Sequence, residues 1–167
     1  MNTPLHKCAQ YAQYPETAKL LINHGAKVNS QNKYGYTPLH QAAGNDDTSV
    51  SRILLENGAD PNIKDKWGRA PIHMAIEMNR RNSAKFLIKY PETDVNAQDN
   101  DNKTALHQCS SYGYLEICIL LIEHGAILDL KNKQGQTPLD TAVEQKQYEI
   151  IKLLEKAINR VKEQDSY

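Results

Sequence analysis

Apolar residues along the chain recur at helical spacing between polar turns. Val50, Ile53 and Leu54 lie three and four positions apart, which places them on one face of a predicted helix. The polar segment 46–49 before them supplies a turn and a helix cap, and Gly58 follows as a helix end. The pattern predicts one helix over this stretch.

A shorter helix is predicted to precede it. Thr37 followed by Pro38 fits an N-cap and the first helical residue, because the hydroxyl accepts from a free amide and proline has a helical φ. Similar tetrapeptides begin 34, 33, 34 and 33 residues apart, a period typical of a solenoid. The five copies are Thr3-Pro4-Leu5-His6, Thr37-Pro38-Leu39-His40, Ala70-Pro71-Ile72-His73, Thr104-Ala105-Leu106-His107 and Thr137-Pro138-Leu139-Asp140.

A tight turn is predicted between consecutive units. Three of these segments begin with Asn or Asp and have glycine at the fourth place, and segment 99–102 ends in Asn102 instead. Because asparagine tolerates positive φ better than other non-glycine residues, we expect the turn to be kept there. Ala70 stands where the other units carry threonine, so the third unit loses a cap and is expected to be the least regular. The first unit carries an extra residue around Tyr11–Pro15.

The typical unit contains, in order, a turn, the tetrapeptide, a short helix, a second turn, a longer helix and Gly-Ala. This arrangement resembles the ankyrin repeat over essentially the whole chain. The resemblance implies an all-α fold, an ankyrin-type solenoid of stacked helix-turn-helix units joined by β-hairpin-like turns. We expect one domain over residues 1–167. The expected repeats are approximately 1–32, 33–65, 66–99, 100–132 and 133–167. The resemblance also implies binding of a partner protein through the concave face and the hairpin tips.

Charge and composition narrow the partner classes. Lys and Arg total 20 and Asp and Glu total 20, so no net positive charge favours nucleic acid. No apolar run is long enough to cross a bilayer, and no secretion signal is visible at the N-terminus. We expect a cytoplasmic or nuclear protein that does not bind membranes and is monomeric when unbound. Its three cysteines fit reduced thiols, with Cys8 and Cys109 filling a position that holds Ala42 in the second unit.

The sequence offers few candidate catalytic or metal-binding residues. His6, His40, His73 and His107 occupy equivalent places in stacked units, too far apart to share a zinc ion, so each is expected to hydrogen-bond nearby backbone. No nucleophile–base pair, phosphate loop or metal motif is apparent. We therefore expect neither enzymatic activity nor a cofactor.

The informative residues are those that the repeat does not require. Positions beside the hairpin glycine and late in the first helix vary between units, and these are the binding positions that the family resemblance implies. Stacking would place Tyr34 beside Trp67, a pair of the kind enriched in interface hot spots. The predicted partner-binding residues are Tyr34, Tyr36, Trp67, Arg69, Met78 and Tyr112.

Competing interpretations stay open at this stage. The aromatic side chains could simply cover the adjacent hairpin, and Met78 could fill the core. The whole chain could also serve as a targeting or regulatory module of a larger enzyme or intracellular effector, or as an inhibitor that occludes an enzyme's active site.

Overall fold

The computed structural model describes residues 1–11 and 14–164. The extra residue expected around positions 11–15 falls partly on residues 12 and 13, which lie outside the described part of the chain. The described residues form ten helices in consecutive pairs. These are α1 (Pro4–Tyr11), α2 (Pro15–Asn23), α3 (Pro38–Ala43), α4 (Ser49–Glu56), α5 (Pro71–Glu77), α6 (Arg81–Ile88), α7 (Ala105–Tyr112), α8 (Leu115–Glu123), α9 (Pro138–Glu144) and α10 (Tyr148–Gln164).

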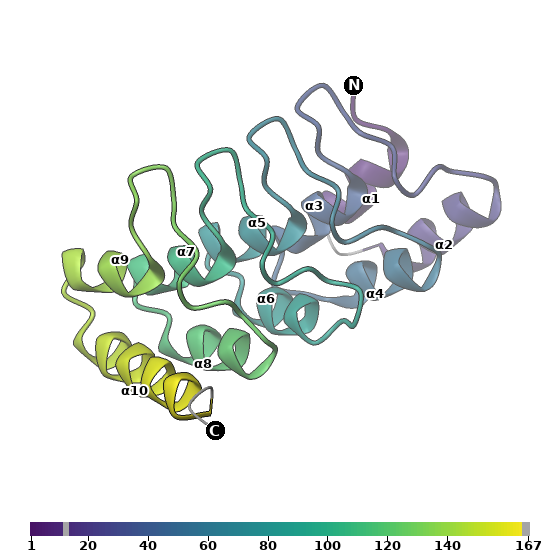
Figure 1. The fold of residues 1–167 in the computed structure, drawn as a ribbon. Helices are drawn as coiled ribbons and strands as arrows, with labels where there is room; N and C mark the ends of the chain where they lie inside the picture. The colour runs from purple at the N-terminus through teal and green to yellow at the C-terminus, as the bar shows by residue number, and fades with distance from the viewer. Residues whose placement is uncertain (12–13, 165–167) are drawn as a thin grey trace.

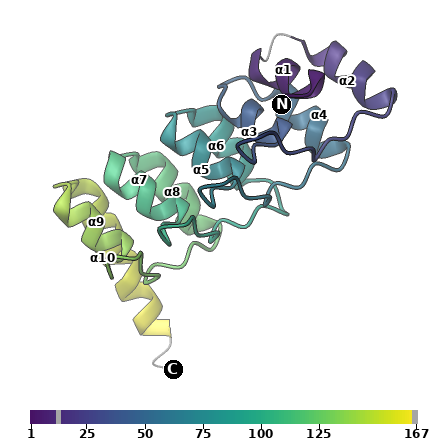
Figure 2. The same cartoon turned by 90° about the horizontal axis from the view of Figure 1, so that it is seen from above.

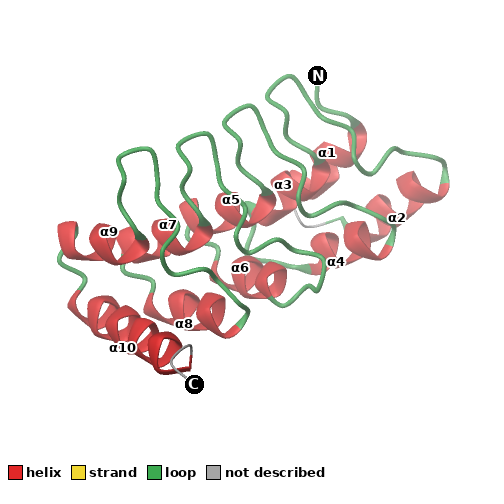
Figure 3. Cartoon of the chain, in the orientation of Figure 1, coloured by secondary structure: helices red, strands yellow, loops and turns green. Residues whose placement is uncertain are grey.

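The helices stack in two rows. The first helices of the pairs, α1, α3, α5, α7 and α9, form one row, and the second helices form another row against it (Figure 1). Long loops project beside the first row, and no strand occurs among the described residues (Figure 3). From above, the pairs follow one another from the N-terminus to the C-terminus (Figure 2). The expected all-α solenoid of helix pairs is confirmed.

The first helices begin at the predicted threonine caps. The Thr37 hydroxyl accepts from the backbone N–H of His40 at 3.3 Å, and Thr104 and Thr137 act in the same way in their own repeats. Ala70 has no side-chain acceptor, yet α5 begins in the same backbone conformation as α3. The start of α5 therefore stays in phase with the other first helices, although the hydroxyl of the cap is missing.

The hairpin loops are held by the residue that opens each turn. The Asn32 carboxamide oxygen accepts from the backbone N–H of Tyr34 at 2.9 Å and of Tyr36 at 3.1 Å. Asp65, Asp99 and Asn132 bind their own loops in the same way. Asn102 has φ 59°, as expected of a residue that replaces the turn glycine.

The core lies between the two helix rows. Leu39, Leu54 and Leu106 are fully buried, and burial of each such side chain stabilises the fold by about 1.5–3 kcal/mol. Alanines are buried among them and allow the helices to approach closely. At the C-terminal end, α10 buries only Ile150 and Leu154, so most of this last helix faces water.

Candidate protein-binding surface

Histidines of the tetrapeptide tie each repeat to the next. The backbone N–H of Thr37 donates to His40 Nδ1 at 3.1 Å, which leaves the proton on Nε2. Nε2 then donates to the carbonyl of Arg69 in the following hairpin at 2.9 Å. His6, His73 and His107 make the equivalent bonds to Tyr36, Lys103 and Gln136.

These rings serve the backbone and do not form a metal centre. Among the described residues, no three His, Cys, Asp or Glu side chains are placed to hold one ion. Burial lowers the pKa of each of the four histidines, and the hydrogen bond to the next hairpin opposes this only in part. The histidines therefore have the predicted structural role, and each of them also joins its own repeat to the next one.

Tyr34, Tyr36 and Trp67 form an aromatic cluster on the hairpin loops of the second and third repeats. The Tyr34 and Trp67 rings stack, with centroids 6.3 Å apart and planes 23° apart. The Tyr36 ring lies 5.9 Å from Trp67 and 6.0 Å from Tyr34. Tyr34 remains 43% exposed and Trp67 47% exposed, so the cluster presents ring surface to solvent.

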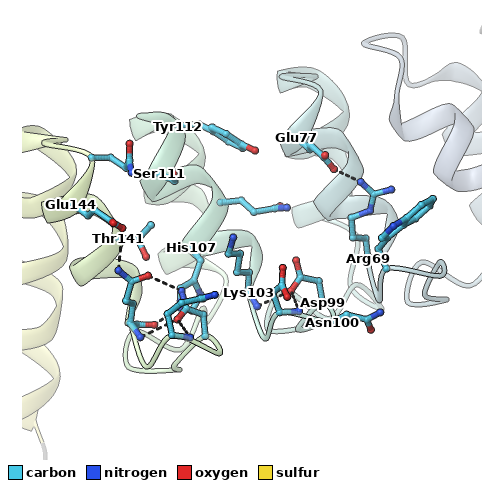
Figure 4. A pocket seen from close by; sticks show the side chains of 17 residues that line it. Arg69, Glu77, Asp99, Asn100, Lys103, His107, Ser111, Tyr112, Thr141 and Glu144 are labelled. Atoms are coloured by element: carbon cyan, nitrogen blue, oxygen red, sulfur yellow. Dashed lines mark hydrogen bonds and ion pairs between the residues drawn. The ribbon is translucent and has the colours of Figure 1, made fainter.

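The Arg69 side chain packs against this cluster. Its guanidinium carbon lies 4.9 Å from the centre of the Trp67 ring, and Nη2 donates to the Tyr36 hydroxyl at 2.9 Å. Nε donates to the buried Asp65 carboxylate at 2.9 Å. Figure 4 shows the bond on the other side, in which Nη1 donates to Glu77 at 2.5 Å. The side chain is held in one orientation by several partners.

Electrostatics favour the charged form of Arg69. Partial burial disfavours the guanidinium, but the hydrogen bond and the negative charge of Asp65 outweigh this effect and raise the pKa above its usual value. Because its donors are engaged within the chain, Arg69 orients Tyr36 and Trp67 and has little capacity left to bind a new carboxylate directly.

Met78 and Tyr112 lie in two hollows that flank the aromatic cluster. Met78 borders a hollow of about 410 Å³ that also includes Tyr36, and its sulfur would lie 3.1 Å from a Cβ added at Gly44. Tyr112 borders a hollow of about 480 Å³ together with Trp67 and Arg69 (Figure 4). Both are nearly half exposed, whereas Met74, one turn before Met78, is buried.

The six predicted residues therefore divide into a centre and two margins. The rings of Tyr34, Tyr36 and Trp67 contact one another, and Arg69 contacts Tyr36 and Trp67. Met78 directly follows α5, and Tyr112 lies at the end of α7. The predicted set omits Asp65 and Glu77, which hold Arg69 in place. Asp65 opens the turn four positions before Arg69, but this spacing in a turn does not fix the direction of the arginine side chain, so no sequence signal identifies the pair.

The stacked helix pairs and projecting hairpins define a repeat solenoid whose exposed loops and first helices form its distinctive surface. A family model described as ankyrin repeats (3 copies) matches residues 5–99 and again residues 72–165. The chain belongs to the ankyrin repeat family, whose repeats generally mediate protein–protein interaction.

Similar segments occur in much longer proteins. The chain is 34% identical over 139 residues to neurogenic locus notch homolog protein 1 of Danio rerio, covering 83% of this chain and 6% of that protein. It is 34% identical over 144 residues to SMC5-SMC6 complex localization factor protein 1 of Bos taurus, covering 85% of this chain and 10% of that protein. The chain thus spans only a small part of these curated relatives.

No helix within residues 1–11 and 14–164 is both long enough and apolar enough to cross a bilayer.

Proposed function

We propose that the chain binds a partner protein through its concave face and hairpin tips, with Tyr34 and Trp67 as the anchor side chains. The observation that carries the proposal is the half-exposed stack of these two rings on adjacent repeats. Interface hot spots are enriched in such aromatic residues and in arginine.

The exposed ring area is large enough to contribute to binding. An aromatic side chain presents about 150–250 Å² in total, so the exposed half of each ring offers on the order of 100 Å². Burial of that area at about 25 cal/mol per Å² would contribute on the order of 2 kcal/mol for each residue. Two anchors of this size exceed the usual threshold for a hot spot.

The surface is also organised before binding. Both hairpins are fixed by buried turn residues, and Arg69 holds Trp67 and Tyr36 at their present orientation. A partner would therefore lose little affinity to the ordering of these side chains. The competing interpretation, in which the rings only cover the adjacent hairpin, predicts no effect of their removal on association.

The experiment that tests this function compares three immobilised forms of the chain in affinity capture from native cell extract, with mass spectrometry of the bound proteins. The forms are the wild type, the double variant Tyr34→Ala/Trp67→Ala, and the control Ile119→Ala, which removes an exposed apolar side chain from α8 in the other helix row. We expect a protein recovered with the wild type and the control but lost with the double variant. Equal recovery with all three forms would rule out the proposed anchors.

A further inference from the structure

Two cysteines of the fourth repeat meet inside the protein. Cys109 lies on α7 and Cys118 on α8, and both side chains are fully buried. Their sulfur atoms are 2.7 Å apart, closer than the roughly 3.5–4.0 Å at which non-bonded heavy atoms rest. Although nine positions separate the two residues in sequence, the turn between the helices brings them face to face.

The same two positions hold small residues in the second and third repeats. The third repeat has Ala75 and Ala84 there, and the second has Ala42 and Ser51. All four are buried, so the helices of these two repeats pack closely around small side chains at this level, whereas the fifth repeat has Ile151 at the second position. In the fourth repeat both members of the pair are cysteine, whereas the first repeat has only Cys8 at one of them.

We propose that Cys109 and Cys118 form a redox site that closes to a disulfide when the protein meets a hydroperoxide. One thiolate attacks the O–O bond and becomes a sulfenic acid, releasing water from hydrogen peroxide. The second thiol then attacks that sulfur and releases a second water. Two thiols thus lose two protons and two electrons, and the peroxide is reduced to two water molecules.

Burial determines how fast this site reacts. It raises the pKa of the Cys109 thiol well above its usual value, so little of the Cys109 thiolate is present in the closed structure. Oxidation therefore proceeds through local opening of α7 and α8, and the pair responds to sustained rather than brief oxidation. Once formed, the bond joins the two helices next to Tyr112 at the end of α7.

The bond also changes stability in a measurable direction. A disulfide across the short loop between α7 and α8 restricts the unfolded chain and raises the midpoint of thermal unfolding. Reduction with dithiothreitol should return the midpoint to its starting value.

The test treats the full chain with hydrogen peroxide, denatures it, alkylates the free thiols and measures its mass. We expect a loss of about 2 Da before alkylation, and alkylation of Cys8 alone. Cleavage after Glu116 should give two peptides that remain linked until reduction. The variant Cys8→Ala should behave in the same way.

Matched variants distinguish the pair from general thiol oxidation. Cys109→Ala and Cys118→Ala introduce the residue that the third repeat carries at these places, so both should fold, and neither should lose 2 Da or gain thermal stability. A wild type that keeps all three thiols alkylatable after prolonged treatment would overturn the proposal. A gain of about 16 Da per added oxygen without a disulfide, or a disulfide that includes Cys8, would also overturn it.

Discussion

The guanidinium of Arg69 lies 4.9 Å from the centre of the Trp67 ring while two carboxylates, those of Asp65 and Glu77, hold it from the other sides. A cation over an aromatic face is attracted to the ring electrons. The orientation of the exposed Trp67 ring therefore depends on Arg69, whose positive charge is already paired with carboxylates of the same chain.

Replacement of Arg69 should loosen Trp67 more than it unfolds the protein. Arg69→Lys keeps a cation near Asp65 but removes the planar fork that reaches Tyr36 and Glu77. Because Trp67 is the only tryptophan of the chain, its fluorescence anisotropy reports this directly. We expect lower anisotropy in Arg69→Lys, with a loss of unfolding free energy of about 1 kcal/mol or less. Unchanged anisotropy would show that Arg69 does not orient the ring.

Restoration of the missing cap should stabilise the third repeat. Thr37 and Thr104 are buried at the position that Ala70 occupies, so the extra atoms of threonine fit there. Ala70→Thr should raise the unfolding free energy by about 1 kcal/mol, and Thr37→Ala should lower it by a similar amount. Urea denaturation measures both changes. If Ala70→Thr destabilises the chain, then the hairpin is closed too tightly around Ala70 to admit a hydroxyl.

Two hairpin glycines should differ in their tolerance of alanine. Gly68 has φ 75° and Gly135 φ 76°, so the backbone strain of a side chain is the same at both. A Cβ at Gly68 would lie 2.6 Å from the backbone nitrogen of Asn100, whereas a Cβ at Gly135 meets nothing within 4 Å. Gly135→Ala should cost about 1 kcal/mol, and Gly68→Ala should cost clearly more. Equal midpoints of thermal unfolding for the two variants would contradict this.

Mild acid should destabilise the solenoid through its buried histidines. Their folded pKa values lie below the value of about 6.5 expected in the unfolded chain, so between these values the unfolded state binds more protons. The stability is fully present above about pH 6.5 and falls as pH drops toward the folded pKa, by up to about 1.4 kcal/mol per pH unit for each histidine.

Denaturant titration between pH 7.5 and 5.5, a range of about two units around the ordinary histidine pKa, measures this slope. His107→Asp introduces the residue that the fifth repeat carries as Asp140, which also binds its own threonine cap. That variant should lose stability at neutral pH but show a shallower slope in acid. A slope equal to that of the wild type would mean that His107 does not contribute.

The fold could be predicted from the sequence because each unit repeats its own local signals. Thr37 and Pro38 start a helix. Asn102 replaces the turn glycine because asparagine tolerates the left-handed backbone conformation that the turn needs. The histidines were correctly interpreted as structural, but their second hydrogen bond goes to the following hairpin. That bond depends on how repeats stack, which no single repeat encodes.

The candidate surface could be predicted only in outline. Stacking of equivalent positions placed Tyr34 beside Trp67 correctly. The role of Arg69 depends on side-chain orientation, since the same spacing would allow it to point into solvent. Likewise, the contact of Cys109 with Cys118 requires the packing of α7 on α8, which their distance in sequence does not reveal.

The central claim is that the stacked rings of Tyr34 and Trp67 anchor a partner protein, and calorimetric titration of the captured partner tests it most directly. The account predicts that Tyr34→Ala/Trp67→Ala weakens binding by more than about fivefold, equivalent to about 1 kcal/mol, while Ile119→Ala binds like the wild type. The midpoints of thermal unfolding of all three forms should agree closely. The same affinity in the double variant as in the wild type would contradict the account.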